Sequence, residues 1–114
     1  MTVQVYETSS EAQQKLPVKP LISGEQAVHN ATNYLLRHVG MYFRGTEPAI
    51  LQLDKVVWQV LVVFKRHSLG PFHAGFIDID AATGDVFPLG AQQIAFIRNR
   101  TDAFIALNAP HPEP

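Results

Sequence analysis

The chain has 114 residues, no cysteine, and nine Lys and Arg against ten Asp and Glu. This length predicts one domain with a core large enough to fold without crosslinks, and the lack of cysteine excludes disulfides, thiolate metal ligands and a cysteine nucleophile. The near-neutral charge, without a basic run, argues against nucleic-acid binding, which normally requires a basic stripe.

The first segment, residues 1–22, contains Pro17 and Pro20 and no sustained periodicity. We therefore expect an extended lead-in arm. Its first residues lack the basic and apolar regions of an export signal, and no apolar run approaches the roughly 20 residues that span a bilayer. These features predict a cytoplasmic protein without a membrane partner.

A helix is predicted to begin at Ser23. Ser23 and Gln26 have the spacing of a capping box, and Gly40 suits a left-handed cap at the other end. Between them, residues at three- and four-residue spacing form one largely apolar stripe: Ala27, Val28, Ala31, Tyr34, Leu35 and His38. This pattern predicts a helix that packs one face against a sheet.

The most apolar stretch is Val56–Phe64, in which only Gln59 is polar. Its β-branched and aromatic residues favour a strand. The side chains of a strand alternate between two faces: Trp58, Val60, Val62 and Phe64 on one, and Val57, Leu61 and Val63 on the other. Because both faces are apolar, each needs a cover. The helix from Ser23 supplies one cover, and a C-terminal helix or a second subunit supplies the other.

Three further strands are predicted around this stretch. A short strand at 50–53 pairs with it through a hairpin at Asp54-Lys55, and a polar turn at 65–71 leads to a third strand at 72–80. In that strand Phe72, Ala74 and Phe76 share one face. A turn containing Gly84 precedes a short fourth strand at 86–87, which Pro88 limits.

The C-terminal segment keeps helical spacing of apolar residues from about 92 to 107, through Ile94, Ile97, Phe104 and Ile105. Residues 110–114 are rich in proline and are expected to be frayed. The prediction is an α+β fold: one N-terminal helix on a four-stranded antiparallel sheet, cystatin-like, plus a C-terminal amphipathic helix. A single domain is expected over residues 23–109.

The order of elements over residues 23–88 is helix, Gly40, strand, tight turn, Trp58-x-Val60-x-Val62, and then Asp78-Ile79-Asp80-Ala81-Ala82-Thr83-Gly84-Asp85-Val86. This order resembles the small PepSY-like, cystatin-like domains, which end on a V-D-A-x-T-G-x-V type of hairpin. The resemblance implies a non-enzymatic interaction or regulatory module, in some relatives one that restrains a peptidase. PepSY-like domains usually lie outside the cytoplasm, whereas this chain shows no export signal. The amphipathic C-terminal helix is also additional to the minimal domain. Both differences weigh against the inhibitor role.

The densest acidic group is Asp78, Asp80 and Asp85 with Thr83. Oxygen ligands at alternate positions suit Ca²⁺, but an EF-hand loop has glycine at its sixth position and glutamate at its twelfth. Counted from Asp78, those positions do not match. We expect a polar hairpin end in which an aspartate caps the turn through the backbone.

Other candidate chemistry is sparse. His67 and His73 flank a Gly-Pro turn, but two imidazoles are too few for a structural zinc site, so we expect surface histidines. The serines do not lie in a nucleophile motif, and no glycine-rich phosphate loop is found. The sequence therefore predicts no enzyme, no catalytic residue, no metal site and no cofactor.

Two functions remain open. The first is an interaction or regulatory module that binds a protein partner, or a second copy of itself, through a sheet face. The alternative is a small-ligand-binding or enzymatic cystatin/NTF2-like domain with a pocket between helix and sheet. The residues that would line such a pocket are Tyr34, His38, Trp58 and Asp78.

Overall fold

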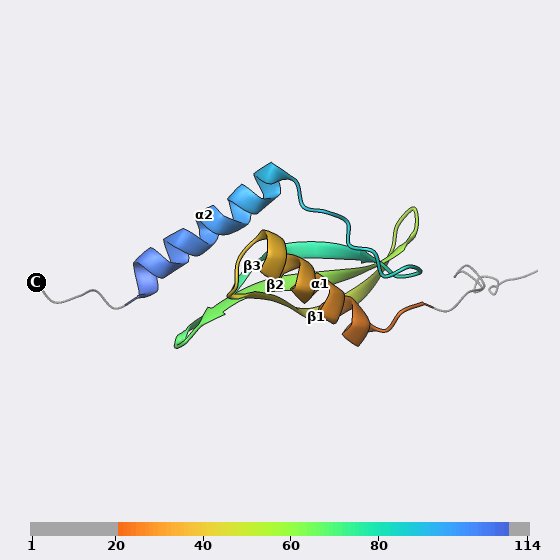
Figure 1. Ribbon diagram of the computed structural model, residues 1–114, viewed down its shortest axis with the longest axis horizontal. Coiled ribbons are helices and arrows are strands. Elements are labelled where there is room, and N and C mark those ends of the chain that lie inside the picture. Colours follow the sequence, from red (N-terminus) through yellow and green to blue (C-terminus); the bar gives the residue numbers. More distant parts are fainter. Residues whose placement is uncertain (1–20, 110–114) are drawn as a thin grey trace, which may run out of the picture.

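The computed structural model describes residues 21–109. They form two helices and an antiparallel sheet in the order α1 (Gly24–His38), β1 (Phe43–Gln52), β2 (Val56–Arg66), β3 (Leu69–Asp80) and α2 (Ala91–Asn108) (Figure 1). The predicted α+β class is confirmed. The expected lead-in arm, apart from its last two residues, and the expected frayed tail lie outside the described residues. Over residues 21–109 no helix is long and apolar enough to cross a membrane.

The helix α1 begins after a side-chain cap, since the Ser23 hydroxyl accepts a hydrogen bond of 3.0 Å from the Gln26 backbone N–H. The predicted left-handed cap at Gly40 is wrong. The helix ends at Val39 in a right-handed conformation, φ −117°. Gly40 is needed for a different reason, because a Cβ there would lie 3.1 Å from the Phe43 ring. The glycine therefore lets Phe43 fold back against the end of α1.

The valine-rich stretch forms the middle strand of the sheet, whose order is β1-β2-β3. β2 pairs antiparallel with both neighbours, so its backbone groups are satisfied on each side. The buried core lies between this strand and the helices, where Val60, Val62, Ile77 and Ile79 meet residues of α1.

The prediction of four strands is wrong, because residues 21–109 contain three. The expected fourth strand is a single bridge between Val86 and Ile79. Pro88 has no N–H to continue a ladder, and the chain then turns away to α2.

The strands are also longer than predicted. β1 starts at Phe43. Its Gly45 fits beneath α1, where a Cβ would lie 2.6 Å from Val60 and 3.2 Å from Ala31. The expected turn at 65–71 is replaced by a two-residue turn at His67-Ser68, where His67 has φ 54°.

Both helices pack on the same face of the sheet, hereafter the inner face, since residues of α1 and α2 share one buried cluster with it. On β2 this face carries Val60, Val62 and Phe64, which share a buried cluster with the alanines of α1. From α2, Phe104 meets Phe64 at 6.4 Å between ring centres and stacks on Phe72 at 4.6 Å. The C-terminal helix therefore does not cover the second face, which excludes one of the two covers expected from the sequence.

Polar contacts hold α2 beside α1. The Arg98 guanidinium donates to the carbonyl oxygen of Val39 at 2.9 and 3.2 Å, which satisfies a free carbonyl at the end of α1. Near the start of α2, the Tyr34 hydroxyl accepts a hydrogen bond of 3.0 Å from the Leu89 backbone N–H. The two helices thus form one layer over the inner face.

Candidate functional site

The outer face is the side of the sheet that points away from both helices. Its residues follow from the register of the three strands: Arg44, Thr46, Ala49 and Leu51 on β1; Val57, Gln59, Leu61 and Val63 on β2; His73, Phe76, Asp78 and Asp80 on β3. Among residues 21–109 no helix covers this face. It is the candidate functional site because its composition is unusual for a face without a cover.

The middle of the outer face is an apolar column. Val57, Leu61 and Val63 are only 3, 8 and 3 % exposed, and each lies between a partner on β1 and a partner on β3. On β3, Phe76 is the cross-strand partner of Leu61, and it is 56 % exposed. The face therefore combines a buried apolar floor with an aromatic side chain that projects into solvent.

One end of the outer face is hollowed. A shallow hollow of about 280 Å³ lies there, and its lining includes Leu53, Lys55, Val57, Asp78 and Phe87. The Lys55 ammonium lies 5.6 Å from the centre of the Phe87 ring, a cation–π distance. At this end the exposed side chains of Leu53 and Phe87 extend the apolar surface beyond the strands.

The edges of the sheet, in contrast, are obstructed. On β1 the ladder is interrupted between Thr46 and Ala49, where Glu47 has φ 50° and Pro48 lacks an N–H. On β3 the Arg100 guanidinium donates to the carbonyl oxygens of His73 at 3.2 Å and Ala74 at 3.0 Å. Bulges, proline and covered backbone groups are the usual means of preventing strand pairing at an edge. A partner of this sheet is therefore better received by its face than by its edges.

The predicted face of β3 is wrong at one position. The ladder shifts between Val62 and Val63, where β3 accommodates the extra residue Ala74. As a result Phe72 lies on the inner face against Phe104, and Phe76 lies on the outer face. The bulge separates two phenylalanines that simple alternation places together.

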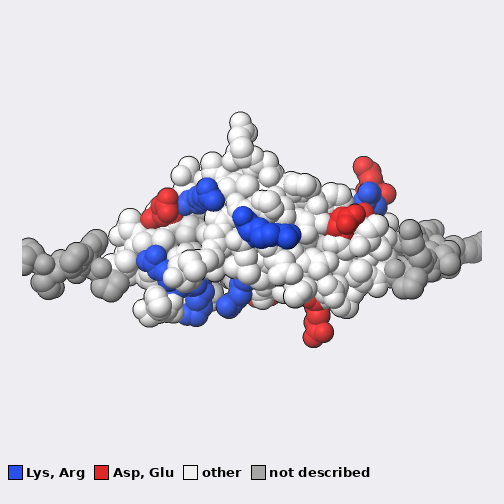
Figure 2. Space-filling view, viewed as in Figure 1, with Lys and Arg blue, Asp and Glu red and all other residues white. Residues whose placement is uncertain are grey.

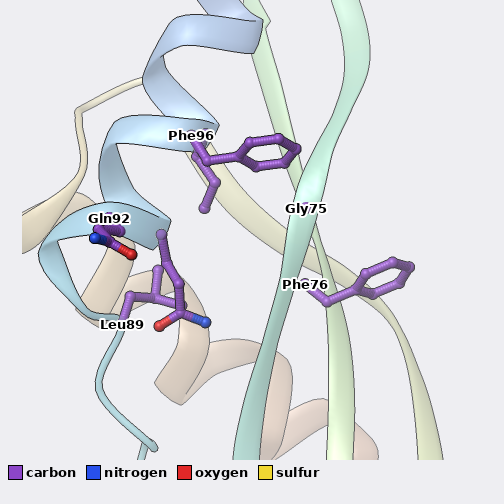
Figure 3. A pocket seen from close by; sticks show the side chains of 7 residues that line it. Gly75, Phe76, Leu89, Gln92 and Phe96 are labelled. Carbon is purple, nitrogen blue, oxygen red and sulfur yellow. The ribbon is translucent and has the colours of Figure 1, made fainter.

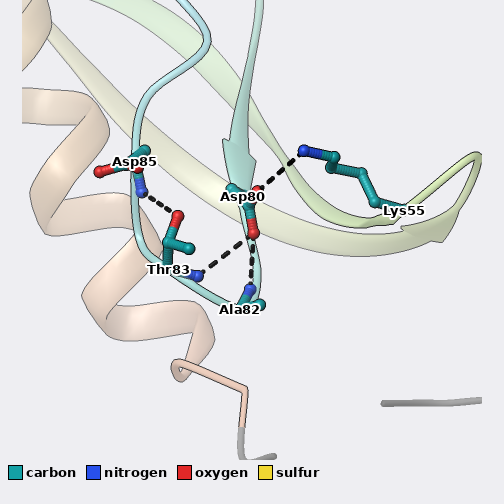
Figure 4. A network of polar contacts seen from close by, with 5 residues as sticks. All are labelled: Lys55, Asp80, Ala82, Thr83 and Asp85. Carbon is teal, nitrogen blue, oxygen red and sulfur yellow. Dashed lines mark hydrogen bonds and ion pairs between the residues drawn. The ribbon is translucent and has the colours of Figure 1, made fainter.

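The turn that follows β3 is organised by Asp80 (Figure 4). One carboxylate oxygen accepts hydrogen bonds from the backbone N–H groups of Ala82 at 2.8 Å and Thr83 at 3.2 Å. The other lies 3.4 Å from the Lys55 ammonium. The hydrogen bond from Ala82 is the largest cause that lowers the pKa of Asp80, with further contributions from Thr83 and Lys55 outweighing the opposing effect of burial.

The remaining groups of this turn bind to each other. The Thr83 hydroxyl accepts from the Asp85 backbone N–H at 3.1 Å, and Gly84, at φ 84°, donates to the Asp80 carbonyl oxygen at 2.7 Å. Asp80 therefore caps the turn through the backbone, as the sequence predicts. Of the oxygen groups that suggested Ca²⁺, the Asp80 carboxylate and the Thr83 hydroxyl hold the chain reversal.

A groove lies between β3 and the start of α2 (Figure 3). It has a volume of about 330 Å³, and its lining includes Gly75, Leu89 and Phe96, with the amides of Gln92 and Gln93. In Figure 3 the Phe96 ring points across the groove toward β3, whereas Phe76 points to the far side of the strand. Phe76 also borders the groove, but its ring points away from it, so the groove and the outer face open on opposite sides of β3.

The four residues expected to line a helix–sheet pocket do not surround one cavity. Tyr34 contacts Leu89 through its hydroxyl, and its ring lies 4.4 Å from that of His38. The Trp58 indole N–H donates to the Ile22 carbonyl oxygen at 3.0 Å. Asp78 is on the outer face. The space between α1 and the sheet is filled by small side chains, since Ala27 and Ala31 are fully buried there.

The two candidate histidines are separated as well. His67 lies in the β2–β3 turn, 6.4 Å from the Tyr42 ring, whereas His73 is exposed on the outer face. Within residues 21–109 no group of three or more His, Asp or Glu side chains is close enough to hold a metal ion.

Charged side chains of both signs are dispersed over the helix-bearing side of the molecule, separated by uncharged surface (Figure 2). The basic side chains on this side lie in separate groups and do not form a continuous stripe. A search against family models, curated proteins and solved structures finds no match for this chain. The outer face is therefore the feature of the molecule that points most directly to a function.

Proposed function

We propose that the protein is a non-enzymatic interaction module whose docking surface is the outer face of the sheet. The observation that carries this proposal is that α1 and α2 lie on the same side, while the opposite side presents an apolar column and an exposed Phe76. Large rings beside a desolvated apolar floor are typical of the residues that contribute most to binding between proteins.

A partner that covers Phe76 removes apolar surface from water, which favours binding. Phe76 is more than half exposed, and burying a phenylalanine side chain fully is worth roughly 1.5–3 kcal/mol. Because the ring is already partly covered, a partner gains about half of this energy, and it does so without first reorganising the sheet. A flat, preformed surface of this kind loses little conformational entropy on binding.

The resemblance to PepSY-like domains supports a regulatory role for the same surface. It depends on the order of helix, strands and Asp-Ala-Ala-Thr-Gly turn, and that order runs from α1 to the turn after β3. We also propose a cytoplasmic location, because a chain without cysteine suits a reducing compartment.

A second candidate function is the binding of a small apolar ligand in the groove between β3 and α2. The specific observation is its volume of about 330 Å³ with Leu89, Phe96 and Ile97 among its lining residues, a size at the lower end for small-molecule sites. A panel of apolar metabolites should then raise the melting temperature of the chain, and Phe96→Ser should remove the increase.

Site-specific photo-crosslinking tests the docking proposal. Benzoylphenylalanine replaces Phe76 in the full chain, and in a second sample replaces Phe96, which is 60 % exposed on the other side of β3. After irradiation in an extract of the native cell, we expect defined adducts at position 76 and few at position 96. Equal labelling at both positions, or no adduct at position 76, contradicts the proposal.

A further inference from the structure

The outer face of β3 carries three side chains in a symmetrical order. His73, Phe76 and Asp78 lie opposite Val63, Leu61 and Gln59 of β2. Phe76 is thus in the middle. Measured along β2, the His73 imidazole lies two residues to one side of it, and the Asp78 carboxylate lies two residues to the other. The bulge at Ala74 creates this spacing, because it brings Phe76 onto the outer face.

We propose that the occupant of the outer face is a second copy of this chain, packed face to face about a two-fold axis through Leu61 and Phe76. The axis crosses the strands, so the strands of the two copies run antiparallel. This inference rests on the proposed docking function and names its partner.

Charge complementarity carries the proposal. Sheets that pack face to face keep their strands within about 30° of each other, at a separation of about 10 Å. Turning one sheet over about the proposed axis places Phe76 against Phe76 of the second copy. It also places His73 against Asp78 of the second copy, and by symmetry the same pair forms again on the other side.

The alternative two-fold axis, parallel to the strands, is less favourable. It lays β1 of one copy over β3 of the other, at the same level along the strands. Arg44 and His73 lie at that same level, since both are opposite Val63. Two basic groups would then face each other, and Asp78 would face Ala49. A carboxylate opposite an imidazole, which can donate a hydrogen bond to it, is the more complementary pairing, so these side chains select the antiparallel arrangement.

The size of the face sets the strength of the pair. Three strands about 4.8 Å apart and about ten residues long give a footprint of roughly 450 Å² per copy. With the projecting side chains, two copies would bury about 1,000–1,200 Å², which is at the lower limit for specific complexes. We expect a dimer that dissociates on dilution, with the apolar column at its centre and the charged pairs at its rim.

Sedimentation equilibrium of the full chain over a range of concentrations tests the dimer. We expect a monomer–dimer equilibrium that Phe76→Ser weakens at least tenfold. Leu36→Ser is the matched control, because this side chain on α1 is also exposed but lies on the side of the sheet opposite the proposed interface, and it should leave the dissociation constant unchanged. A monomer at every concentration, or equal effects of both substitutions, overturns the proposal.

A charge swap tests the register. His73→Asp places a carboxylate against Asp78 of the second copy, and Asp78→His places an imidazole against His73, so each single change should weaken the dimer several-fold. The double variant His73→Asp with Asp78→His restores opposite groups at both positions and should recover the dimer. Lack of recovery, with the circular dichroism spectrum unchanged, overturns the antiparallel register.

The photo-crosslinking adducts separate this inference from the docking function. An adduct at position 76 with the mass of two chains supports the second copy. Adducts at position 76 with other masses only, from a chain that sediments as a monomer, overturn the second copy and keep the docking function. No adduct at position 76 and no dimer overturn both.

Discussion

The two faces of the sheet share the same middle strand, but they are buried in different ways. On the inner face, Val60 and Val62 contact side chains from α1 and α2 in a continuous core. On the outer face, Val57 and Val63 are nearly as inaccessible, although no helix among residues 21–109 lies over them. Low exposure therefore has two causes here, contact with another layer and enclosure by neighbours in the same layer. Only the first kind adds residues to the core cluster between the sheet and the helices, so it should stabilise the fold more.

The largest expected effect compares a leucine from each environment. Leu35 on α1 is fully buried in the core, so Leu35→Ala should lower the free energy of unfolding by about 2–5 kcal/mol through the cavity that it leaves. Leu61→Ala on the outer face should lower it by roughly 1–2 kcal/mol, since water fills the space. Urea unfolding monitored by Trp58 fluorescence measures both. Equal losses would mean that the outer face is also packed by a layer of this chain.

Glycine substitutions sharpen the comparison within the inner face. A Cβ at Gly45 would lie 2.6 Å from Val60 and 3.2 Å from Ala31, whereas at Gly75 it would lie 3.3 Å from Ile97. Gly45→Ala should therefore destabilise by roughly 1–3 kcal/mol through overpacking. Gly75→Ala should change stability by about 0.5 kcal/mol or less, since the Ile97 side chain can shift. Thermal unfolding of the two variants checks this order, and a reversed order would contradict the close contact between α1 and β1.

A pH series examines the turn at the end of both faces. The pKa of Asp80 is lowered in the folded chain, chiefly by the hydrogen bond from Ala82. Its ionised form therefore stabilises the fold above the unfolded pKa of about 4, and this contribution is lost as the pH falls through the folded value.

The corresponding variant is Asp80→Asn, which should be less stable than the parent by about 1 kcal/mol at pH 7, with the difference shrinking below pH 4. Urea unfolding at pH values from 2 to 7 measures it. Asp85→Asn is the control, because only the backbone of Asp85 joins the hydrogen bonds of the turn, and it should have the smaller effect. A difference that persists unchanged at pH 2 would exclude the carboxylate as its cause.

The smallest effect on stability is expected at the centre of the proposed interface. Phe76→Ser removes an exposed ring, so the free energy of unfolding of the dilute chain should change by no more than about 0.5 kcal/mol. Unfolding at a concentration below the dimer dissociation constant measures this value. A loss comparable to that of Leu35→Ala would show that Phe76 serves the fold and not the contact between copies.

The sequence predicts best where one residue type dominates. The valines of β2 favour a middle strand in any context, and Ser23 with Gln26 fits a helix start, so both are recognisable without coordinates. The predicted strand at 50–53 is shorter than β1, because Arg44 and Thr46 are polar and Gly45 has no side chain. The apolar signal of a strand is therefore missing from this part of β1. The missing strand at 86–87 depended on two residues beside a proline, too few to form a ladder.

The site was harder to predict than the fold. A two-sided apolar strand indicates two covers, but nothing in the spacing of α2 says which face it takes. That choice is made by contacts between distant residues, such as Phe104 with Phe72 and Arg98 with Val39. The bulge at Ala74 adds one residue without a sequence signal, and it alone moves Phe76 to the outer face. The second apolar face of the strand at 56–64, with Val57, Leu61 and Val63, is the sequence signal that points to this surface.

The Arg100 guanidinium that holds the carbonyl oxygens of His73 and Ala74 has a further consequence for assembly. The guanidinium also lies 5.1 Å from the centre of the Phe72 ring on β3 and 5.6 Å from that of the Phe96 ring on α2, so both elements hold it in place. Subunits joined edge to edge present a new edge after every addition and can polymerise, whereas two sheets joined by their faces form a closed pair. By occupying the backbone of β3, Arg100 favours an assembly that stops at two copies over one that grows into fibres.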